Sequence, residues 1–444
     1  MKPLMLITGP VATRSGYGSH SRDLVRSLIA MDRFDIKINS LRWGNTPMNA
    51  LDENNPEDIK ISERILTNNE MPRQPDVHIQ ISVPNEFTPI AKYNIGITAG
   101  IENTAPKSEW IQGMNRMNMN IVPSKFVKGI FESITYEEIN EQTKQKTGEL
   151  KSQKPIEVLF EGADTNIYKK TKEISRELKT EMDSIEERFV FLYTGHWLQG
   201  DLGQDRKDTG MLLKTFLETF KNKPNPPALV MKTSGATFSI IDRNEIKQKI
   251  EDIKNTVKGK LPPVYFLHGN LTDKEMNQLY NHPKVKAHVS LTHGEGFGRP
   301  LLEASLSEKI VIASDWSGHK DFLNKNNSVL LPGAMTAVHK SALPKEMFVD
   351  GAQWFTVNYQ YASQVMIDVF KNIRQYNMKA KKQAMYNRVN FSMERMTKEF
   401  SKILDKYLPK FEEQPQQVNL KLPKLKKIDK TEPQKMKLPK LKKV

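Results

Sequence analysis

Residues 293–304 read His293-Gly294-Glu295-Gly296-Phe297-Gly298-Arg299-Pro300-Leu301-Leu302-Glu303-Ala304, a glycine-rich turn with two glutamates. An apolar run precedes the turn at 287–291 and a helix-like run follows at 301–307, which predicts a strand, a turn and a helix start. Free backbone N–H groups and the positive end of the helix dipole then face the turn and attract a phosphate. Glu295 lies in the turn, and Glu303, about two helical turns later, can reach hydroxyl groups of the bound molecule. A phosphate beside hydroxyls suggests a nucleotide sugar as the ligand.

This stretch resembles the donor-binding signature of the retaining GT-B glycosyltransferases, especially glycosyltransferase family 4 (group 1), whose pattern is close to E-G-F-G-x-P-x-x-E-A. The residues that fall into the pattern are Glu295, Gly296, Phe297, Gly298, Pro300, Leu302, Glu303 and Ala304. A buried turn followed by an ordinary helix would explain the glycines but not the two flanking carboxylates. The resemblance implies that Glu295 contacts the donor sugar and stabilises an oxocarbenium-like transition state. It also implies that Glu303 binds the ribose and that the helix end at Gly296, Phe297 and Gly298 stabilises the leaving diphosphate.

The composition fits a chain with two folded domains and no membrane span. The 444 residues give room for two cores, and no long apolar run appears. The short apolar N-terminus leads into a glycine turn, which favours a first parallel strand over a signal peptide. The sequence has no cysteine, which excludes disulfides and cysteine-ligated metals and fits a cytoplasmic protein.

Short apolar runs alternate with helix-like segments along most of the chain. They occur at 4–7, 36–41, 77–81, 94–99 and 120–122, and again at 189–193, 228–231, 264–267, 287–291, 310–313 and 329–331. Such alternation predicts βαβ units and parallel sheets, so we expect an α/β protein with two doubly wound, Rossmann-like domains that face a cleft, as in GT-B enzymes. The polar residues 132–155 are expected to form a surface helix or an inserted loop.

The expected domains follow from these two series of strands. Residues 1–170 form an N-terminal, acceptor-side domain, and residues 171–377 form a C-terminal domain that binds the nucleotide sugar. Residues 378–411 resemble the C-terminal GT-B helix that returns to the N-terminal domain. Between the two domains, the segment 156–164 resembles the family's interdomain strand, with Glu161 in place of an asparagine.

The last residues, 412–444, have the composition of a disordered, Lys-rich tail. Ten lysines against Asp429 and Glu432 give residues 421–444 a net charge of +8, out of +15 for the whole chain. The motif Lys-Leu-Pro-Lys-Leu-Lys-Lys occurs twice, at 421–427 and 437–443. We expect this tail to bind a polyanion or an acidic protein surface, although a plain solubilising tail is equally compatible with the sequence.

Basic residues after the strand at 189–193 are candidates for the diphosphate site. The family has Gly-Arg at the strand end and Arg-Lys-Gly or Lys-Gly before the next helix, and its arginine and lysine bind the diphosphate. Arg206 and Lys207 match the second element, whereas His196 stands in place of the first arginine. The alternative is a solvated basic pair beside Asp205 and Asp208. With Glu295, Lys207 and Arg206 are the predicted catalytic residues.

Further donor contacts are expected at other strand ends. Lys232 directly follows the apolar run at 228–231. We expect it to face the diphosphate or, with equal weight, the solvent. Asn270 and Leu271 lie where the family's backbone meets the nucleotide base. Gly16 and Gly18 resemble a glycine-rich loop near the donor phosphate, and their spacing does not fit the dinucleotide fingerprint G-x-G-x-x-G.

The acceptor side is less well defined by the sequence. Many family members place a histidine near residue 100 of this chain, where none is present. Glu102 and His20 are the candidate replacements. Family use favours a glycan, a lipid-linked sugar or a protein as the acceptor, whereas the basic charge favours a DNA-modifying enzyme of bacteriophage type that acts on hypermodified bases. A non-catalytic scaffold that binds a sugar nucleotide is a third reading.

The resemblance implies transfer of a sugar, a hexose by expectation, with retention of anomeric configuration. The metal-binding pair Asp-x-Asp is absent from the sequence. We therefore expect no metal and no cofactor, with the nucleotide-diphosphate sugar as co-substrate.

Overall fold

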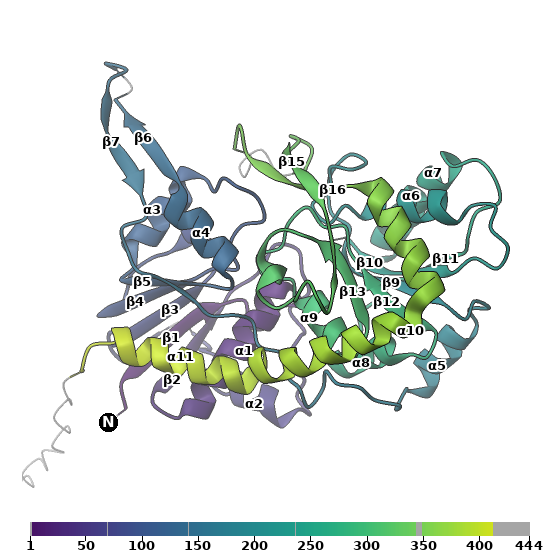
Figure 1. Cartoon of the computed structure of the whole chain (residues 1–444). Coiled ribbons are helices and arrows are strands. Elements are labelled where there is room, and N and C mark those ends of the chain that lie inside the picture. The colour runs from purple at the N-terminus through teal and green to yellow at the C-terminus, as the bar shows by residue number, and fades with distance from the viewer. Residues whose placement is uncertain (1, 69, 141, 236, 343–348, 412–444) are drawn as a thin grey trace, which may run out of the picture. The chain divides into compact units, whose positions relative to one another are not determined.

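The computed structural model describes residues 2–411 except 69, 141, 236 and 343–348, and residues Lys2–Pro409 form one compact unit. The predicted tail at 412–444 lies outside the described residues. The first sheet is parallel, in the order β2-β1-β3-β4-β5-β8 (Figure 1). Its strands are β1 (Leu4–Gly9), β2 (Asp35–Ser40), β3 (Val77–Ile81), β4 (Tyr93–Ile97), β5 (Met119–Val122) and β8 (Ile156–Val158). β1 and β3 are buried along their whole length, because helices cover both faces of a parallel sheet.

The second sheet is also parallel, in the order β11-β10-β9-β12-β13-β14. Its strands are β9 (Val190–His196), β10 (Ala228–Ser234), β11 (Val264–Leu267), β12 (Val285–Val289), β13 (Ile310–Ser314) and β14 (Val329–Leu331). Each apolar run noted in the sequence overlaps one of these strands. The prediction of two Rossmann-like domains is therefore confirmed.

The helices, except the last one, which follows another helix, each begin after a connection that leaves the carboxyl end of a strand. They are α1 (Gly16–Met31), α2 (Pro56–Ser62), α3 (Ser108–Arg116), α4 (Lys125–Ser133), α5 (Arg176–Asp183), α6 (Thr209–Phe220), α7 (Ile240–Asn255), α8 (Asp273–Asn281), α9 (Arg299–Leu306), α10 (Tyr359–Asn390) and α11 (Met393–Tyr407), with short 3-10 turns at Pro84–Glu86 and Gly318–Asp321. Side-chain caps fix several starts, as where Ser15 accepts from the Gly18 amide. No helix in the described part of the chain has the length and apolar character needed to cross a membrane.

The C-terminal helical region starts earlier than residue 378. α10 begins at Tyr359 and has a break in helical geometry at Asn372, and α11 follows almost directly. α11 packs on α1 of the first domain, where the Thr397 hydroxyl lies 2.9 Å from the Ser27 hydroxyl (Figure 1). An ion pair of 2.7 Å between Arg33 and Asp405 adds to this contact.

Residues 132–155 were expected to form a surface helix or an inserted loop, and beyond the end of α4 at Ser133 they form an inserted hairpin. Strands β6 (Thr135–Ile139) and β7 (Lys146–Lys151) pair as an antiparallel hairpin. Tyr136 and Leu150 face each other on its more buried side, while Lys146 bridges two glutamates on the exposed side. The alternation was masked by the high content of Glu, Lys and Gln. A second hairpin, β15 (Gly333–Ala337) with β16 (Gln353–Val357), was not predicted.

Candidate active site

An ion pair joins the loop after β9 to the turn after β12. Lys207 Nζ lies 2.5 Å from Glu295 Oε1, and Arg206 Nη1 lies 3.5 Å from Glu295 Oε2. Arg206 also donates to the Gly294 carbonyl at 3.1 Å, and the His293 amide donates to the Arg206 carbonyl at 2.9 Å. The structure thus brings together the three residues that were predicted to be catalytic.

This cluster is shielded from water and carries both signs of charge. The side chains of Lys207 and Glu295 are 12% and 9% exposed. Burial alone would raise the pKa of the Glu295 carboxyl, but the Lys207 ammonium and the Arg206 guanidinium lower it to about 2. Glu295 is therefore a carboxylate at neutral pH, beside two cations that can bind a diphosphate.

The glycines of the turn allow a close approach to the first domain. A Cβ atom on Gly294 would lie 2.1 Å from the Glu102 carbonyl oxygen, and one on Gly296 would lie 2.1 Å from that of Ala99. The Ser124 hydroxyl, which also caps α4, donates to the Gly296 carbonyl at 2.7 Å. Glu102 Oε1 lies 3.5 Å from Arg206 Nη1, so this acceptor-side candidate does border the cluster.

Phe297 belongs to the hydrophobic core of the second domain. Its side chain is 2% exposed and packs on Phe322 and Phe391, so it is not available to a ligand. Gly298 follows with φ of +100° and caps α9 without a side chain. A left-handed residue is needed at this position, which glycine adopts without strain. The left-handed conformation of Gly298 therefore sets the point in the turn at which α9 begins.

Glu303 lies on α9 in a second buried polar cluster. Its Oε1 accepts from Arg299 Nε at 3.0 Å, and its Oε2 accepts from the Tyr280 hydroxyl at 3.3 Å. Burial raises the pKa of Glu303 to about 7, and Arg299 opposes this rise. Arg299 also pairs with Asp23 of α1 at 2.5 Å. Neither Arg299 nor Tyr280 was assigned from the sequence, although Arg299 and Glu303 have the spacing of a helical ion pair.

The other donor-side candidates surround these two clusters. His196 is exposed at the end of β9, with Nδ1 3.0 Å from the Gly235 carbonyl oxygen. Lys232 donates to the Gly269 carbonyl at 2.8 Å, and burial lowers its pKa to about 8. Asn270 and Leu271 lie next to Gly269, in the connection between β11 and α8. Lys232 therefore holds the loop that was predicted to meet the base.

The three candidates Gly16, Gly18 and His20 all lie on α1 of the first domain. Gly16 and Gly18 occupy the first turn of this helix, which begins at Gly16. A Cβ atom on Gly18 would lie 2.2 Å from the Thr13 carbonyl oxygen, so the loop packs tightly there. His20 is 1% exposed, and burial lowers its pKa to about 4. Its buried Nδ1 has no hydrogen-bond partner within the described residues, and the charges of Asp23 and Arg299 act on its pKa.

A cavity of about 970 Å³ lies between the two domains beside Arg299. Its first-domain wall includes Arg14, Arg22 and Asn49, and its second-domain wall includes Leu271 and Asp273. Arg299 lines the cavity and donates a hydrogen bond to Glu303. The cavity is therefore adjacent to Glu303, the residue expected to bind the ribose. In the described part of the chain, no group of three or more His, Asp or Glu side chains is placed to hold a metal ion.

Two further residues, Asp208 and His293, border the cluster, and the sequence assigned no role to either. Asp208, directly after Lys207, has φ of +51° and accepts from the Tyr359 hydroxyl at 2.7 Å. The His293 ring stacks on Trp354 at 4.3 Å, and its Nε2 lies 3.7 Å from Asp208 Oδ1. A signal was present, since Asp208 stands where the family pattern has a glycine.

Comparisons with known proteins agree with this fold. Residues 230–342 match the model of the family Glycosyl transferases group 1. HepE of Anabaena, solved with UDP and glucose, is 13% identical with a TM-score of 0.54, and the match covers 91% of this chain and 100% of HepE. Sucrose-phosphate synthase from Thermosynechococcus elongatus is 12% identical with a TM-score of 0.58, over 91% of this chain and 99% of that one. A glycosyltransferase from Rickettsia africae is 15% identical with a TM-score of 0.56, over 92% and 99%. At such identities these structures show the shared fold, and no curated protein sequence matches the chain.

Proposed function

We propose that this chain, which carries a glycosyl transferases group 1 domain at residues 230–342, transfers a sugar from a nucleoside diphosphate sugar to an acceptor with retention. The observation that carries the proposal is the buried ion pair of 2.5 Å between Lys207 and Glu295. This pair supports the proposal because it holds a cation suited to a diphosphate and a carboxylate suited to a sugar next to each other, in the connections that follow two neighbouring parallel strands. Ligands of open α/β sheets bind at this edge.

Charge development explains how these residues would act. The bond between the anomeric carbon and the diphosphate oxygen breaks, and its electron pair leaves with the diphosphate. Lys207 and Arg206 stabilise this growing negative charge, while the Glu295 carboxylate stabilises the positive charge on the sugar. An acceptor hydroxyl oxygen forms the new bond on the same face and gives its proton to the departing diphosphate. Glu303 holds the ribose, and no protein nucleophile is required.

We further propose that the reaction needs no metal ion and takes place in the cytoplasm. Two cations already lie within 3.5 Å of the carboxylate, so side chains can neutralise the leaving diphosphate. The absence of cysteine from the sequence fits the reducing compartment.

The acceptor that we favour is a glycan or another non-nucleic macromolecule. The cavity beside Arg299 has walls of mixed charge. Its ionisable residues are the acidic Asp23, Asp52, Glu53, Glu57, Asp58, Asp164 and Asp273 and the basic Arg14, Arg22, Arg26, Lys274 and Arg299. An acceptor that enters through this cavity meets more carboxylates than cations, which would repel a nucleic acid backbone. This observation disfavours the bacteriophage-type reading.

The test is release of nucleoside diphosphate from a panel of nucleotide sugars, with EDTA present, in the presence of glycan, protein or duplex DNA acceptors. UDP-glucose is the first donor to try, because HepE has been solved with it. Turnover in EDTA with a glycan or protein, lost in the Glu295→Gln variant, is expected. Turnover that is abolished by EDTA and restored by Mn²⁺ would contradict the metal-independent mechanism, and turnover only with DNA would contradict the acceptor class. A binding-only scaffold would bind the donor without any turnover.

A further inference from the structure

The second half of α10 has an exposed face without acidic residues. From Lys371 to Asn390 the sequence contains no Asp or Glu. The basic residues of this segment, all exposed, are Lys371, Arg374, Lys379, Lys381, Lys382 and Arg388. The break at Asn372 separates this half from the first half of the helix.

Large apolar side chains lie in the middle of this basic face. Met378, Met385 and Val389 are 69%, 70% and 70% exposed. They are spaced by seven and four residues, so they form one stripe along the helix. By the same spacing Lys381 and Arg388 flank the stripe on one side, and Lys379 flanks it on the other. Cations therefore border an apolar centre on both sides.

The opposite face of this half is fixed to the body of the second domain. Gln383 donates to the Phe322 carbonyl at 2.6 Å, and Asn387 donates to the Ser305 hydroxyl at 2.7 Å. Both side chains are buried. Because these bonds set the rotation of the helix, the outward direction of the apolar stripe is a fixed property of the fold.

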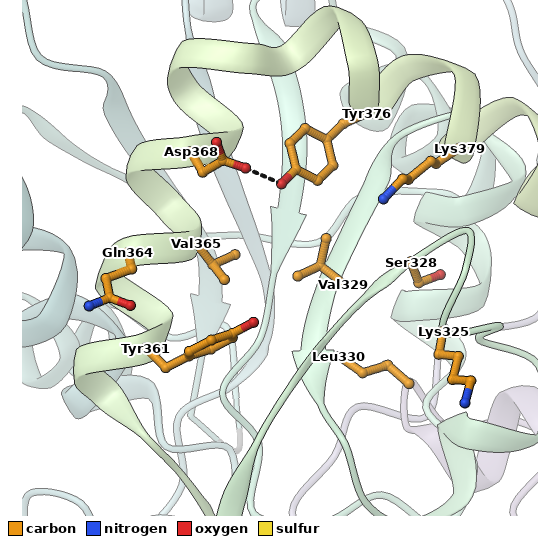
Figure 2. Close-up of a pocket in the computed structure, with 10 residues that line it drawn as sticks. All are labelled: Lys325, Ser328, Val329, Leu330, Tyr361, Gln364, Val365, Asp368, Tyr376 and Lys379. Carbon is orange, nitrogen blue, oxygen red and sulfur yellow. Dashed lines mark hydrogen bonds between the residues drawn. The ribbon is translucent and has the colours of Figure 1, made fainter.

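One acidic residue, Asp368, lies at the start of the basic face. Figure 2 shows Asp368 and Tyr376 bridging the break at the rim of a cavity of about 430 Å³, with Lys379 on the same wall. The Asp368 carboxylate accepts from Tyr376 and from Asn372, and these bonds lower its pKa. Lys379 lies with Nζ 5.4 Å from the centre of the Tyr376 ring. The charges of Lys379 and Lys371 also lower the pKa of Asp368, so this carboxylate offsets part of the basic charge at the first turn of the face, while Lys381, Lys382 and Arg388 lie further along the helix.

We propose that this face of α10, residues 374–389, docks on an anionic lipid surface. Cations attract lipid phosphates, and a central apolar stripe inserts between headgroups, which is the usual design of an interfacial helix. A nucleic acid would pair with the cations but leave Met378, Met385 and Val389 without apolar partners. A second copy of the helix, or the Lys-rich tail with its charge of +8, would bring like charges together. The proposal is independent of which sugar or acceptor the enzyme uses, and it would place the transfer reaction at a lipid surface.

Site-specific fluorescence separates this face from the tail. Because the sequence has no cysteine, Val389→Cys in the full chain gives a single site for a polarity-sensitive dye. Vesicles of phosphatidylcholine with phosphatidylglycerol should shift the emission to the blue, and vesicles of phosphatidylcholine alone should not. The matched control is Ile241→Cys, which replaces a 71% exposed residue of α7 and should show no shift. If the protein sediments with anionic vesicles but the dye at 389 does not shift, another segment binds the lipid and the proposal is wrong.

Charge reversal gives the second measurement. The full chain with Lys379→Glu, Lys381→Glu and Lys382→Glu should bind anionic vesicles at least about tenfold more weakly, since each cation near such a surface contributes to binding. The control carries Lys144→Glu, Lys146→Glu and Lys151→Glu on exposed positions of the β6–β7 hairpin, with the same change in net charge. Equal weakening in both variants would mean unspecific attraction and would overturn the proposal. A dye shift that is caused by duplex DNA but not by vesicles would also overturn the proposal.

Discussion

Lys207 Nζ and Glu295 Oε1 lie 2.5 Å apart, although 88 residues separate the two in the sequence. Each residue follows a strand of the second sheet, and β9 and β12 are neighbours in that sheet. In the absence of a donor the two charges neutralise each other. A bound diphosphate would compete with Glu295 for Lys207, which would leave the carboxylate free to meet the sugar. The pair therefore keeps both groups charged and in place in a nearly dry site.

Replacing Lys207 by alanine tests this assignment. The Lys207→Ala variant should lose about two to three orders of magnitude in turnover, as expected when a preorganised charge on the leaving group is removed. It should also be less stable by roughly 1–3 kcal/mol, because Glu295 stays buried with Arg206 alone. Donor turnover and urea unfolding measure the two effects.

The double variant Lys207→Ala, Glu295→Gln is the matched control. Removing the second charge should recover much of the lost stability, since no unpaired carboxylate remains, while turnover should stay low. If Lys207→Ala turns over the donor at the rate of the wild type, the diphosphate site lies elsewhere.

Glu295 of the turn and Glu303 of α9 should differ in the kinetic effects of their replacement. Glu303→Gln should weaken donor binding, because a ribose contact acts in the ground state and the transition state alike. Glu295→Gln should mainly reduce turnover, because its charge meets the reacting sugar. Titration of donor binding and single-turnover rates separate the two parameters. Equal losses in both parameters for both variants would refute this division of roles.

Donor affinity should depend on pH through Glu303. Burial raises the pKa of Glu303 to about 7, so the carboxylate takes up a proton as the pH falls from 8 to 6. A protonated carboxyl has fewer acceptor sites for ribose hydroxyls, and the dissociation constant should rise in this window. The Glu303→Gln variant should lack this step and keep only the pH dependence of the nucleotide itself. A step of the same size in both proteins would remove Glu303 from the ribose site.

Glu161 should make stability depend on pH in the opposite sense to an ion pair. Burial raises its pKa to about 7, although Arg299 opposes the rise. A carboxyl whose pKa is raised in the folded state contributes stability below its unfolded pKa of about 4.5, and this contribution is lost as the pH rises through 7. Between pH 5 and pH 8 the Glu161→Gln variant should therefore gain stability relative to the wild type. Urea unfolding at both values measures the difference, and a constant difference would contradict the assignment.

Much of the fold could be predicted from the sequence, because strands that are buried on both faces appear as continuous apolar runs. The place of Lys207 and Glu295 in the candidate site could be predicted for a related reason, since each lies in the connection that follows such a run. Contacts between segments that are far apart in the sequence could not be predicted. The pairing of Arg299 with Asp23, 276 residues apart, depends on how the two domains meet. The β6–β7 hairpin was misread because its exposed face is made of charged residues that also favour helices.

Asp208 should position Lys207 through its backbone. Its φ of +51° is left-handed, a conformation that Asn tolerates and Ala does not, and its carboxyl accepts from Tyr359. Burial raises the pKa of Asp208 well above its ordinary value, and Asp208→Asn preserves the shape of the side chain without a charge that burial disfavours. We expect Asp208→Asn to keep stability and turnover near those of the wild type. Asp208→Ala should cost about 2 kcal/mol of stability and lower turnover about tenfold by displacing Lys207. Thermal unfolding and donor turnover check both variants, and an Asp208→Ala enzyme with normal turnover would show that the loop keeps Lys207 in place without this residue.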